Sequence, residues 1–412
     1  MPRRQPAHEE FEHGRLRLTL VQIGLDHGKL IEVGQKRCGR DVHAHAPRVL
    51  CPYETMGREL LTWIKPGAPW PRKHQLVAAA ARAKVARIGF VGDLMLGRLV
   101  SEQLRHGRTP ESCWGDIGPL MRQADGVIAN LECAITTHAQ PWHRTAKVFH
   151  FGADPKAIDV LRAGNIRAVS LANNHILDFE TAGLFDTLDT LDRAGIVHAG
   201  ADRSEEEVFA PAAVRIGGVE IALFSVTDNE PPFAARGGEA GTAYLDPSDR
   251  ASAARPSAAE IVRARANGAE FVVLSCHMGP NMVLEPSRTI RSYRTDAVAR
   301  GIDIVHGHSA HVVQGVERIG HSLVLHDTGD FLDDYAVDPI LHNDWSFIFF
   351  LETDARGLRR LNLVPVMLEL AQVRRARPDE AGPICARMIA QSAKFGTDFA
   401  QTAEGLELVL QA

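Results

Sequence analysis

Polar side chains that can bind a metal or move a proton follow a series of short apolar segments in this chain of 412 residues. The segments have the length of buried strands and are bounded by turn residues. Because ligands of open α/β sheets bind beyond the carboxyl ends of the strands, we expect these side chains to form one site. The last segment ends at Asp327 and Asp330. The metal-ligand candidates are Asp93, Glu132, Asn174, His277, His308 and His311.

The candidate set combines oxygen donors with imidazole nitrogens and contains no cysteine. Hard divalent ions favour oxygen ligands and imidazole suits Zn, Fe and Mn, so the set is typical of a hydrolytic centre rather than a structural zinc site. Six ligands exceed the needs of one tetrahedral ion and suit two ions about 3.5–4 Å apart. We therefore expect one or two divalent ions (Mn, Fe or Zn), bridged by Glu132, that lower the pKa of a bound water towards about 7.

Proton transfer and substrate binding need further side chains near the metal. His175 follows Asn174 directly, so it can lie beside the ions without binding them and protonate a leaving oxygen. Asp178 follows at helix-like spacing and can orient this imidazole. Arg98 and Lys147 are the candidates for pairing with a substrate anion. The simpler alternatives are a core histidine and solvated surface cations.

The composition is that of an ordinary globular protein, with 45% hydrophobic and 24% charged residues. The formal net charge of −5 gives no basic excess, so we expect no nucleic-acid partner. Six scattered cysteines without a CxxC pair are typical of a reduced, cytoplasmic protein. No apolar stretch approaches the roughly 20 residues of a membrane helix, and no secretory signal is evident at the N-terminus, so no membrane anchor is expected.

The pattern of apolar segments divides the chain in two. Residues 1–84 are rich in Arg, His and Pro, and we expect a weakly ordered extension or a small appendage there. In residues 85–412, strands alternate with helical segments, which favours an α/β fold that includes a C-terminal helix at 377–396. Three strand-like segments follow one another within 323–368 and favour an antiparallel component. One mixed sheet, or two sheets face to face with helices outside, would fit this pattern.

The order of the motifs resembles the capsule-synthesis CapA, or poly-γ-glutamate synthesis, family, which is similar to the calcineurin-like metallophosphatases. The resemblance spans about residues 85–370. It implies a metallophosphatase-like, four-layer α/β/β/α sandwich of two mixed sheets, with the site at one edge. The matching stretches are Gly92–Arg98, Asn130–Glu132, Ser170–Asp178, His277–Gly279, Gly307–Glu317 and Thr328–Asp334.

Two positions depart from the metallophosphatase pattern. Met95 stands where the opening Asp-x-His motif has its histidine, and one extra residue separates His308 from His311. A mononuclear centre is therefore an alternative to a dinuclear one. The resemblance also leaves open which of His306, His308 and His311 are ligands.

The function that we expect is a metal-dependent hydrolase, a phosphoesterase of the CapA type that uses metal-activated water on a small-molecule or anionic polymer substrate. One alternative is a non-catalytic accessory or binding factor for poly-γ-glutamate or another anionic capsule polymer, in which Arg98 and Lys147 matter and metal is dispensable. Another alternative is a hydrolase that cleaves γ-glutamyl amide bonds with the same water.

Overall fold

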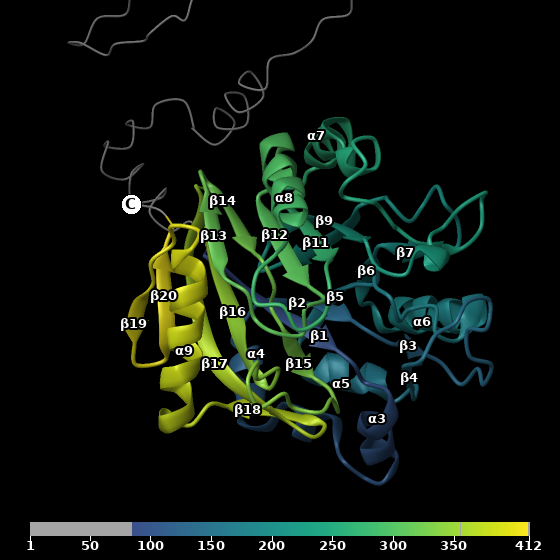
Figure 1. Cartoon of the computed structure of the whole chain (residues 1–412), viewed down its shortest axis with the longest axis horizontal. Helices are drawn as coiled ribbons and strands as arrows, with labels where there is room; N and C mark the ends of the chain where they lie inside the picture. Colours follow the sequence, from purple (N-terminus) through teal and green to yellow (C-terminus); the bar gives the residue numbers. More distant parts are fainter. Residues whose placement is uncertain (1–84, 355, 411–412) are drawn as a thin grey trace, which may run out of the picture. The chain divides into compact units, whose positions relative to one another are not determined.

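Two mixed β-sheets pack face to face, with helices on their outer faces, in the computed structural model of this protein (Figure 1). The structure describes residues 85–354 and 356–410. The extension expected at residues 1–84 lies outside these described residues. Within them, the arrangement of the layers confirms the four-layer α/β/β/α sandwich of two mixed sheets.

The larger sheet has the strand order β19-β20-β17-β16-β1-β2-β5-β6. Its parallel half consists of β1 (Ala86–Leu94), β2 (Gly126–Leu131), β5 (Ile166–Ser170) and β6 (Val197–Ala199). Its antiparallel half consists of β16 (Trp345–Asp354), β17 (Gly357–Glu369), β20 (Gly405–Val409) and β19 (Ala400–Thr402). In addition, β15 (Asp330–Leu332) pairs with β1, and β18 (Gln372–Arg375) pairs with β17.

The smaller sheet has the strand order β13-β14-β12-β11-β9-β8. Its four central strands run parallel and are β14 (Ser322–Leu325), β12 (Ile304–His308), β11 (Phe271–His277) and β9 (Val219–Thr227). The antiparallel edge strands are β13 (Val316–Ile319) and β8 (Ala212–Ile216). Two short strand pairs lie outside both sheets: β3 (Ala134–Ile135) with β4 (Gly152–Ala153), and β7 (Ala201–Asp202) with β10 (Gly241–Thr242).

Side-chain alternation along the strands builds the layers. In β16, Phe347, Phe349 and Leu351 belong to the core between the sheets, whereas Ile348 and Phe350 belong to the core under the helices of the larger sheet. This is the period of two that a pleated strand imposes. Because both faces are covered, the strands read as continuous apolar runs in the sequence.

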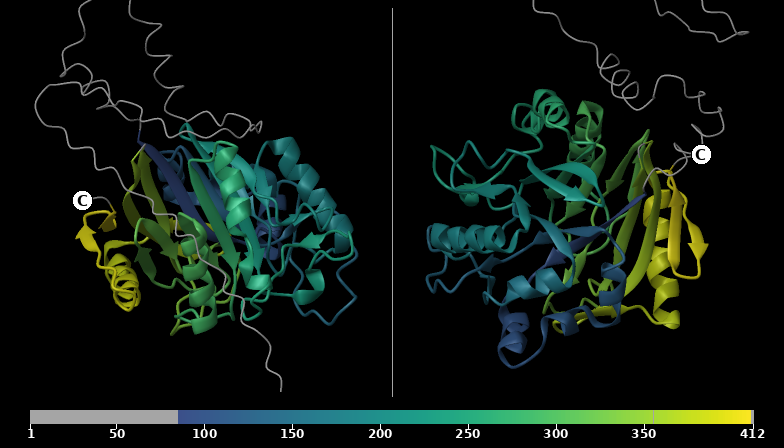
Figure 2. Two further views of the ribbon diagram at one scale, coloured as in Figure 1. Left: turned by 90° about the horizontal axis from the view of Figure 1, so that it is seen from above. Right: turned by 180° about the vertical axis from the view of Figure 1, so that it is seen from behind.

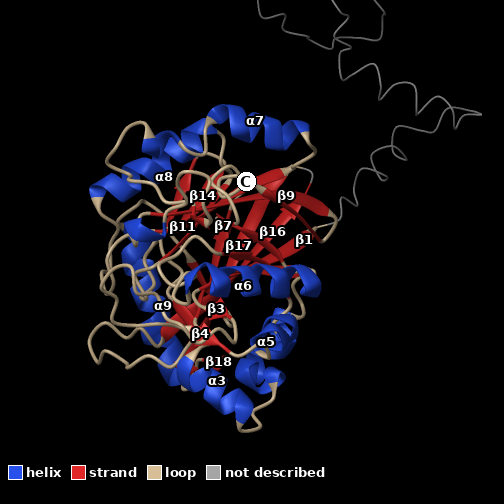
Figure 3. Ribbon diagram, turned by 90° about the vertical axis from the view of Figure 1, so that its right-hand side faces the viewer, coloured by secondary structure: helices blue, strands red, loops and turns tan. Residues whose placement is uncertain are grey.

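Helices cover the outer faces of both sheets (Figure 3). The larger sheet carries α3 (Arg98–Arg105), α4 (Gly118–Met121), α5 (Ala157–Ala163) and α6 (Glu180–Ala194). The smaller sheet carries α7 (Ala258–Ala266) and α8 (Arg288–Arg300). Short 3₁₀ segments occur at η1 (Pro110–Ile117), which is kinked at Gly115, and at η2 (Pro231–Phe233) and η3 (Ser252–Ala254).

The predicted C-terminal helix is α9 (Pro378–Ala393), which contacts β13, β17 and β20 (Figure 2). Its Ile384, Cys385 and Met388 join the core between the two sheets. The helix therefore covers that core at the side where the C-terminal strands lie. In the described part of the chain, no helix has the length and apolar character needed to cross a membrane.

The segment 323–330, which the sequence predicts as one closing strand, is divided between the two sheets. Its first part belongs to β14 of the smaller sheet, and its last residue begins β15 of the larger one. Between them, the Thr328 N–H donates to the Gly307 carbonyl and the Gly329 carbonyl accepts from the Asp93 N–H. The single-strand prediction was wrong because these residues bond to both sheets in turn.

Two glycines make this crossing sterically feasible. A Cβ atom on Gly92 would lie 1.8 Å from the Gly329 carbonyl oxygen, and one on Gly307 would lie 2.0 Å from the His326 carbonyl oxygen. Real side chains do not approach backbone atoms so closely, so the ends of β1 and β12 need glycine at these positions. Each glycine directly precedes a predicted metal ligand.

Replacing Gly92 should therefore destabilise the protein and disturb the end of β1. We expect Gly92→Ala to lower the free energy of unfolding by roughly 1–3 kcal/mol, the usual cost of overpacking, as measured by urea denaturation. Gly382→Ala is the matched control, because a Cβ atom there meets nothing within 4 Å and lies inside α9. Equal stability of the two variants would refute the packing explanation.

Candidate metal centre

Five of the six predicted metal ligands lie in two adjoining groups at the carboxyl ends of strands. Ligand atoms of Asp93, His277 and His308 all lie within 4.8 Å of one another. The same limit holds for a second group, which contains Asp93, Glu132, His311 and Asp330. Every member is buried, and Asp93 belongs to both groups.

The carboxylate shared by the two groups is Asp93, not Glu132, which the sequence suggested as the bridge. Asp93 Oδ1 lies 3.7 Å from His308 Nδ1, and Asp93 Oδ2 lies 3.7 Å from His311 Nδ1. Glu132 Oε1 lies 3.7 Å from His277 Nε2 and 3.9 Å from His175 Nε2. The two oxygens of Asp93 thus face the two groups from between them.

Asp330 is a member of the second group that the sequence analysis did not select as a ligand. Its Oδ1 lies 2.7 Å from His311 Nδ1, and the parallel pairing of β15 with β1 sets Asp330 beside Asp93. The signal in the sequence was its place at the end of an apolar segment. The nearby Asp327 shares that signal, but its oxygens accept from the Ala310 and Gly329 N–H groups and hold the turn before His311.

Of the three histidines in residues 306–311, His308 and His311 lie in the candidate ligand groups. His306 has both ring nitrogens occupied elsewhere, at 3.0 Å from the Val91 carbonyl and 3.1 Å from Ser275 Oγ. Met95, which replaces the expected histidine, is fully buried in the apolar core under the helices of the larger sheet. His311 and Asp330 are the groups that flank the second side of Asp93 instead.

A chain of hydrogen bonds connects Asp93 to the turn before His175 and fixes the orientation of the Asp93 carboxylate. Asn130 Nδ2 donates to Asp93 Oδ1 at 2.8 Å, and Asn173 Nδ2 donates to Asn130 Oδ1 at 3.1 Å. Asn173 Oδ1 in turn accepts from the His175 N–H. The sequence analysis missed both asparagines, although they lie inside the matching stretches Asn130–Glu132 and Ser170–Asp178. Such outer partners orient ligands and tune their affinity.

Several buried oxygens at the centre have no hydrogen-bond partner among the described residues. They are Asp93 Oδ2, Glu132 Oε1, Asn174 Oδ1 and Asp330 Oδ2. An unsatisfied buried acceptor costs about 1–3 kcal/mol, so four in the ligand candidates call for an explanation. Mixed carboxylate, amide and imidazole donors are suited to divalent ions such as Mn, Fe or Zn. The residues therefore fit a divalent metal.

Burial dominates the electrostatics of the centre. It raises the pKa values of Asp93, Glu132 and Asp330 well above their usual range, and repulsion among the neighbouring carboxylates adds to the effect. Burial would lower the pKa of His311, but attraction to Glu132 and Asp93 outweighs it and raises that pKa. Burial and mutual repulsion therefore oppose ionisation of these carboxyl groups, and a bound cation would stabilise their ionised forms.

His175 and Asp178 form a buried pair at the edge of the centre. His175 Nδ1 lies 2.6 Å from Asp178 Oδ2, and the imidazole stacks on the Phe151 ring at a centroid distance of 3.8 Å. Burial lowers the pKa of His175 well below its usual value and raises the pKa of Asp178 to about 7. Because Asp178 occupies Nδ1, the Nε2 atom is the edge of His175 directed to Glu132.

The two predicted substrate-binding cations differ in their surroundings. Lys147 Nζ donates to the Asn174 carbonyl at 2.7 Å and lies 3.4 Å from Asp178 Oδ1 and 3.2 Å from Glu230 Oε2. Its side chain is 6% exposed, so it holds the turn that carries His175. Arg98 is 38% exposed, pairs with Asp334 at 3.2 Å and lines a cavity.

This cavity, of about 380 Å³, opens directly beside the centre. His175 and His311 belong to both its wall and the centre. The remaining lining residues are Arg98, Phe149, Phe151, Asn281, Met282, Tyr335, Ala336 and Asn343. Its contact with the predicted ligands makes it the candidate substrate cavity.

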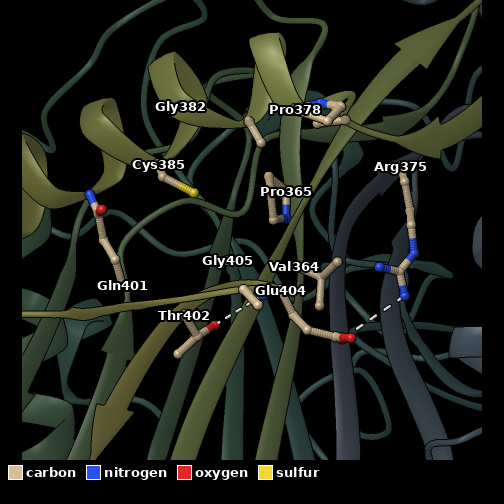
Figure 4. Close-up of a pocket in the computed structure, with 13 residues that line it drawn as sticks. Val364, Pro365, Arg375, Pro378, Gly382, Cys385, Gln401, Thr402, Glu404 and Gly405 are labelled. Carbon is tan, nitrogen blue, oxygen red and sulfur yellow. Dashed lines mark hydrogen bonds and ion pairs between the residues drawn. The ribbon is translucent and has the colours of Figure 1, made fainter.

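A second hollow, of about 370 Å³, lies between α9 and the β19–β20 hairpin (Figure 4). Arg375 and Glu404 line it and approach each other to 4.0 Å. Its wall contains none of the site residues that the sequence predicts. It is therefore separate from the candidate metal centre.

The family to which the chain belongs follows from its central region. Residues 87–335, more than half of the chain, match the family described as bacterial capsule synthesis protein PGA_cap. The chain belongs to this family. The resemblance drawn from the motifs is thereby confirmed, and the match contains both ligand groups and the His175–Asp178 pair.

Relatives of the PGA_cap protein carry names from capsule and polymer biosynthesis. It is 27% identical over 252 residues to the PGA biosynthesis protein CapA of Bacillus subtilis, a match that covers 61% of this chain and 64% of the relative. It is 26% identical over 340 residues to a probable polyglutamine synthesis accessory protein of Mycobacterium tuberculosis, a match that covers 72% of this chain and 88% of the relative. The match thus spans less than two thirds of the Bacillus subtilis relative.

Solved structures with some similarity include two enzymes. Sulfate thiohydrolase SoxB of Thermus thermophilus has a TM-score of 0.39 and 13% identity, covering 76% of this chain and 61% of that one. The 5'-nucleotidase of Candida albicans has a TM-score of 0.38 and 8% identity, and the match covers 77% of this chain and 60% of that one. At these TM-scores the description of the centre rests on the residues of this chain alone.

The shared position of Asp93 gives a graded prediction for metal content. We expect Asp93→Asn to weaken metal affinity at least about 100-fold and Asp330→Asn to affect only the second group, because loss of a direct ligand exceeds the effect of an outer partner. Elemental analysis of protein purified without chelator measures the difference. Asp159→Asn, at an exposed helical carboxylate, is the control. Unchanged metal content in Asp93→Asn would contradict the assignment.

Proposed function

We propose that this PGA_cap protein is a metal-dependent hydrolase that acts as a phosphoesterase. The observation that carries the proposal is a pair of ligand groups that share Asp93 and lie beside the His175–Asp178 pair. Metal-assisted hydrolysis requires a ligand set of this kind, an adjacent proton donor and an open cavity for the substrate.

In this proposal each ligand group holds one divalent ion. Asp93, His277 and His308 would bind the first ion, and a second would be bound by Asp93, Glu132, His311 and Asp330. The unpartnered amide oxygen of Asn174 is a further ligand candidate. When bound, such ions supply charge that stabilises developing negative charge on a substrate oxygen and acidify a water molecule.

His175 would serve as the general acid of the reaction. Asp178 fixes Nδ1 of the imidazole, so Nε2 can carry a proton on the side of the centre. The negative charge of an arriving phosphate ester favours the protonated imidazole, which can then protonate the leaving oxygen. Lys147 would contribute by holding Asn174 and Asp178 in place rather than by touching the substrate.

Arg98 would orient the substrate from the cavity wall. Its guanidinium is the cationic group that lines the cavity, and Asp334 holds it at 3.2 Å. Charge-assisted hydrogen bonds from a guanidinium match the oxygens of a phosphoryl group. Positioning of this kind brings the reacting phosphorus within reach of the centre.

Replacement of His175 should separate catalysis from metal binding. We expect His175→Asn to lower kcat for phosphate-ester hydrolysis by about 10²–10⁴-fold, the usual contribution of a general acid, while metal content stays unchanged. Phosphate release from ethyl phosphate, whose basic alkoxide needs a proton to leave, provides the measurement, with elemental analysis in parallel. His143→Asn is the control, since His143 is 64% exposed and pairs with Glu180. Loss of metal together with activity would make His175 a ligand instead.

A second candidate function is that of an accessory factor for an anionic polymer, which the names of the relatives favour. Under this proposal poly-γ-glutamate binds without metal. Retention of polymer by the protein after treatment with a chelator, together with loss of binding in Arg98→Gln, would support it. Release of glutamate from the polymer, in place of phosphate from esters, would favour γ-glutamyl amide hydrolysis.

A further inference from the structure

We propose that the cavity beside the metal centre binds a planar aromatic group of the substrate. The preferred substrate would then be a small phosphate ester of an aromatic alcohol rather than an anionic polymer. This inference rests on the proposed hydrolase function and adds the substrate class.

The cavity and the centre are continuous. His175 and His311 line the cavity, while His311 belongs to a ligand group and His175 Nε2 lies 3.9 Å from Glu132 Oε1. A phosphoryl group at the centre therefore has its ester substituent next to the cavity wall. Whatever the cavity recognises is the part of the substrate that does not react.

Aromatic rings dominate that wall. Phe149 and Phe151 are roughly parallel, with an interplanar angle of 29° and centroids 6.4 Å apart, and Phe151 stacks in turn on His175. The ring centroid of Tyr335 lies 5.7 Å from that of Phe151 and 5.3 Å from that of His311. Phe149 is 61% exposed, which leaves much of a large apolar ring uncovered beside the site. Flat ring faces of this kind are suited to stacking with another aromatic group.

The charge of the wall suits one anionic group rather than a polyanion. Arg98 is the one arginine or lysine among the described residues that line the cavity, and Asp334 already pairs with it. Lys147 is buried between Asp178 and Glu230 and has no free charge to offer. A polymer with one carboxylate per residue needs a row of cations, because each further unpaired charge would meet apolar or uncharged polar side chains of this wall.

The size of the cavity fits the proposed occupant. An enclosed apolar cavity of about 150 Å³ accommodates benzene. The cavity here has a volume of about 380 Å³ and is open to solvent on one side. It therefore has room for a single aromatic ring, or for two fused rings, beside a phosphoryl group.

Ligand binding to the metal-loaded protein tests the subsite without any need for turnover. Benzylphosphonate and ethylphosphonate carry the same charge and differ in the ring, and calorimetry gives their affinities. We expect benzylphosphonate to bind about tenfold more tightly, the effect of one good ring contact. Phe149→Ala should abolish most of this difference and leave ethylphosphonate binding unchanged. Val148→Ala is the matched control, because Val148 is 85% exposed and does not line the cavity.

Four results would overturn the proposal. The first is equal affinity for the two phosphonates, and the second is a Phe149→Ala variant that weakens both alike. The third is cyclohexylmethylphosphonate binding as tightly as benzylphosphonate, which would show an apolar pocket without aromatic preference. Tighter binding of poly-γ-glutamate than of benzylphosphonate would likewise exclude an aromatic substrate.

Turnover of benzyl phosphate and ethyl phosphate, whose leaving alkoxides are similarly basic, separates this inference from the proposed function. A ring-dependent affinity for phosphonates without phosphate release from either ester would refute the hydrolase and retain the subsite. Phosphate release from both esters with equal kcat/KM and equal phosphonate affinities would retain the hydrolase and refute the subsite. A higher kcat/KM for benzyl phosphate than for ethyl phosphate, lost in Phe149→Ala because KM for benzyl phosphate rises, would support both the hydrolase and the aromatic subsite.

Discussion

The burial of several carboxylates at one point between two sheets is the constraint on which the rest of this structure depends. Carboxylate oxygens of Asp93, Glu132 and Asp330 lie within 4.8 Å of one another, and the three side chains are almost inaccessible to solvent. Charges removed from water at such separations repel strongly, and burial opposes their ionisation. The protonated form of His311 offsets part of this charge. Divalent cations would offset the remainder and would use the oxygens that have no hydrogen-bond partner.

The fold enforces this arrangement through backbone contacts rather than through the ligands themselves. Residues 326–329 run from one sheet to the other and bond to the ends of β1 and β12. Glycines at positions 92 and 307 allow that approach. Hydrogen bonds through Asn130 and Asn173 then connect Asp93 to the turn that carries His175. Candidate ligands from both sheets and the candidate acid are therefore held by the same set of contacts.

The sequence predicted the layers and most of the centre because both depend on local patterns. Apolar runs covered on both faces marked β1, β2, β5, β11 and β12, and the polar residues at their ends marked the candidate ligands. Asp330 could not be selected over Asp327, because what distinguishes them is the pairing of β15 with β1, a contact between distant segments. The sequence suggested Glu132 as the bridge; in the structure, Asp93 is the residue that belongs to both candidate ligand groups. The burial of Lys147 among carboxylates is likewise a tertiary effect that its residue type does not reveal.

The most direct measurement is a crystal structure of the full chain grown with Mn²⁺, in which anomalous scattering locates the metal without reference to any substrate. We expect anomalous peaks on one or both sides of the Asp93 carboxylate, within bonding distance of His277 and His308 or of His311 and Asp330. Well-ordered density for these side chains without a peak beside Asp93, in crystals soaked to saturation with the ion, would contradict the central claim that the buried carboxylates form a metal centre.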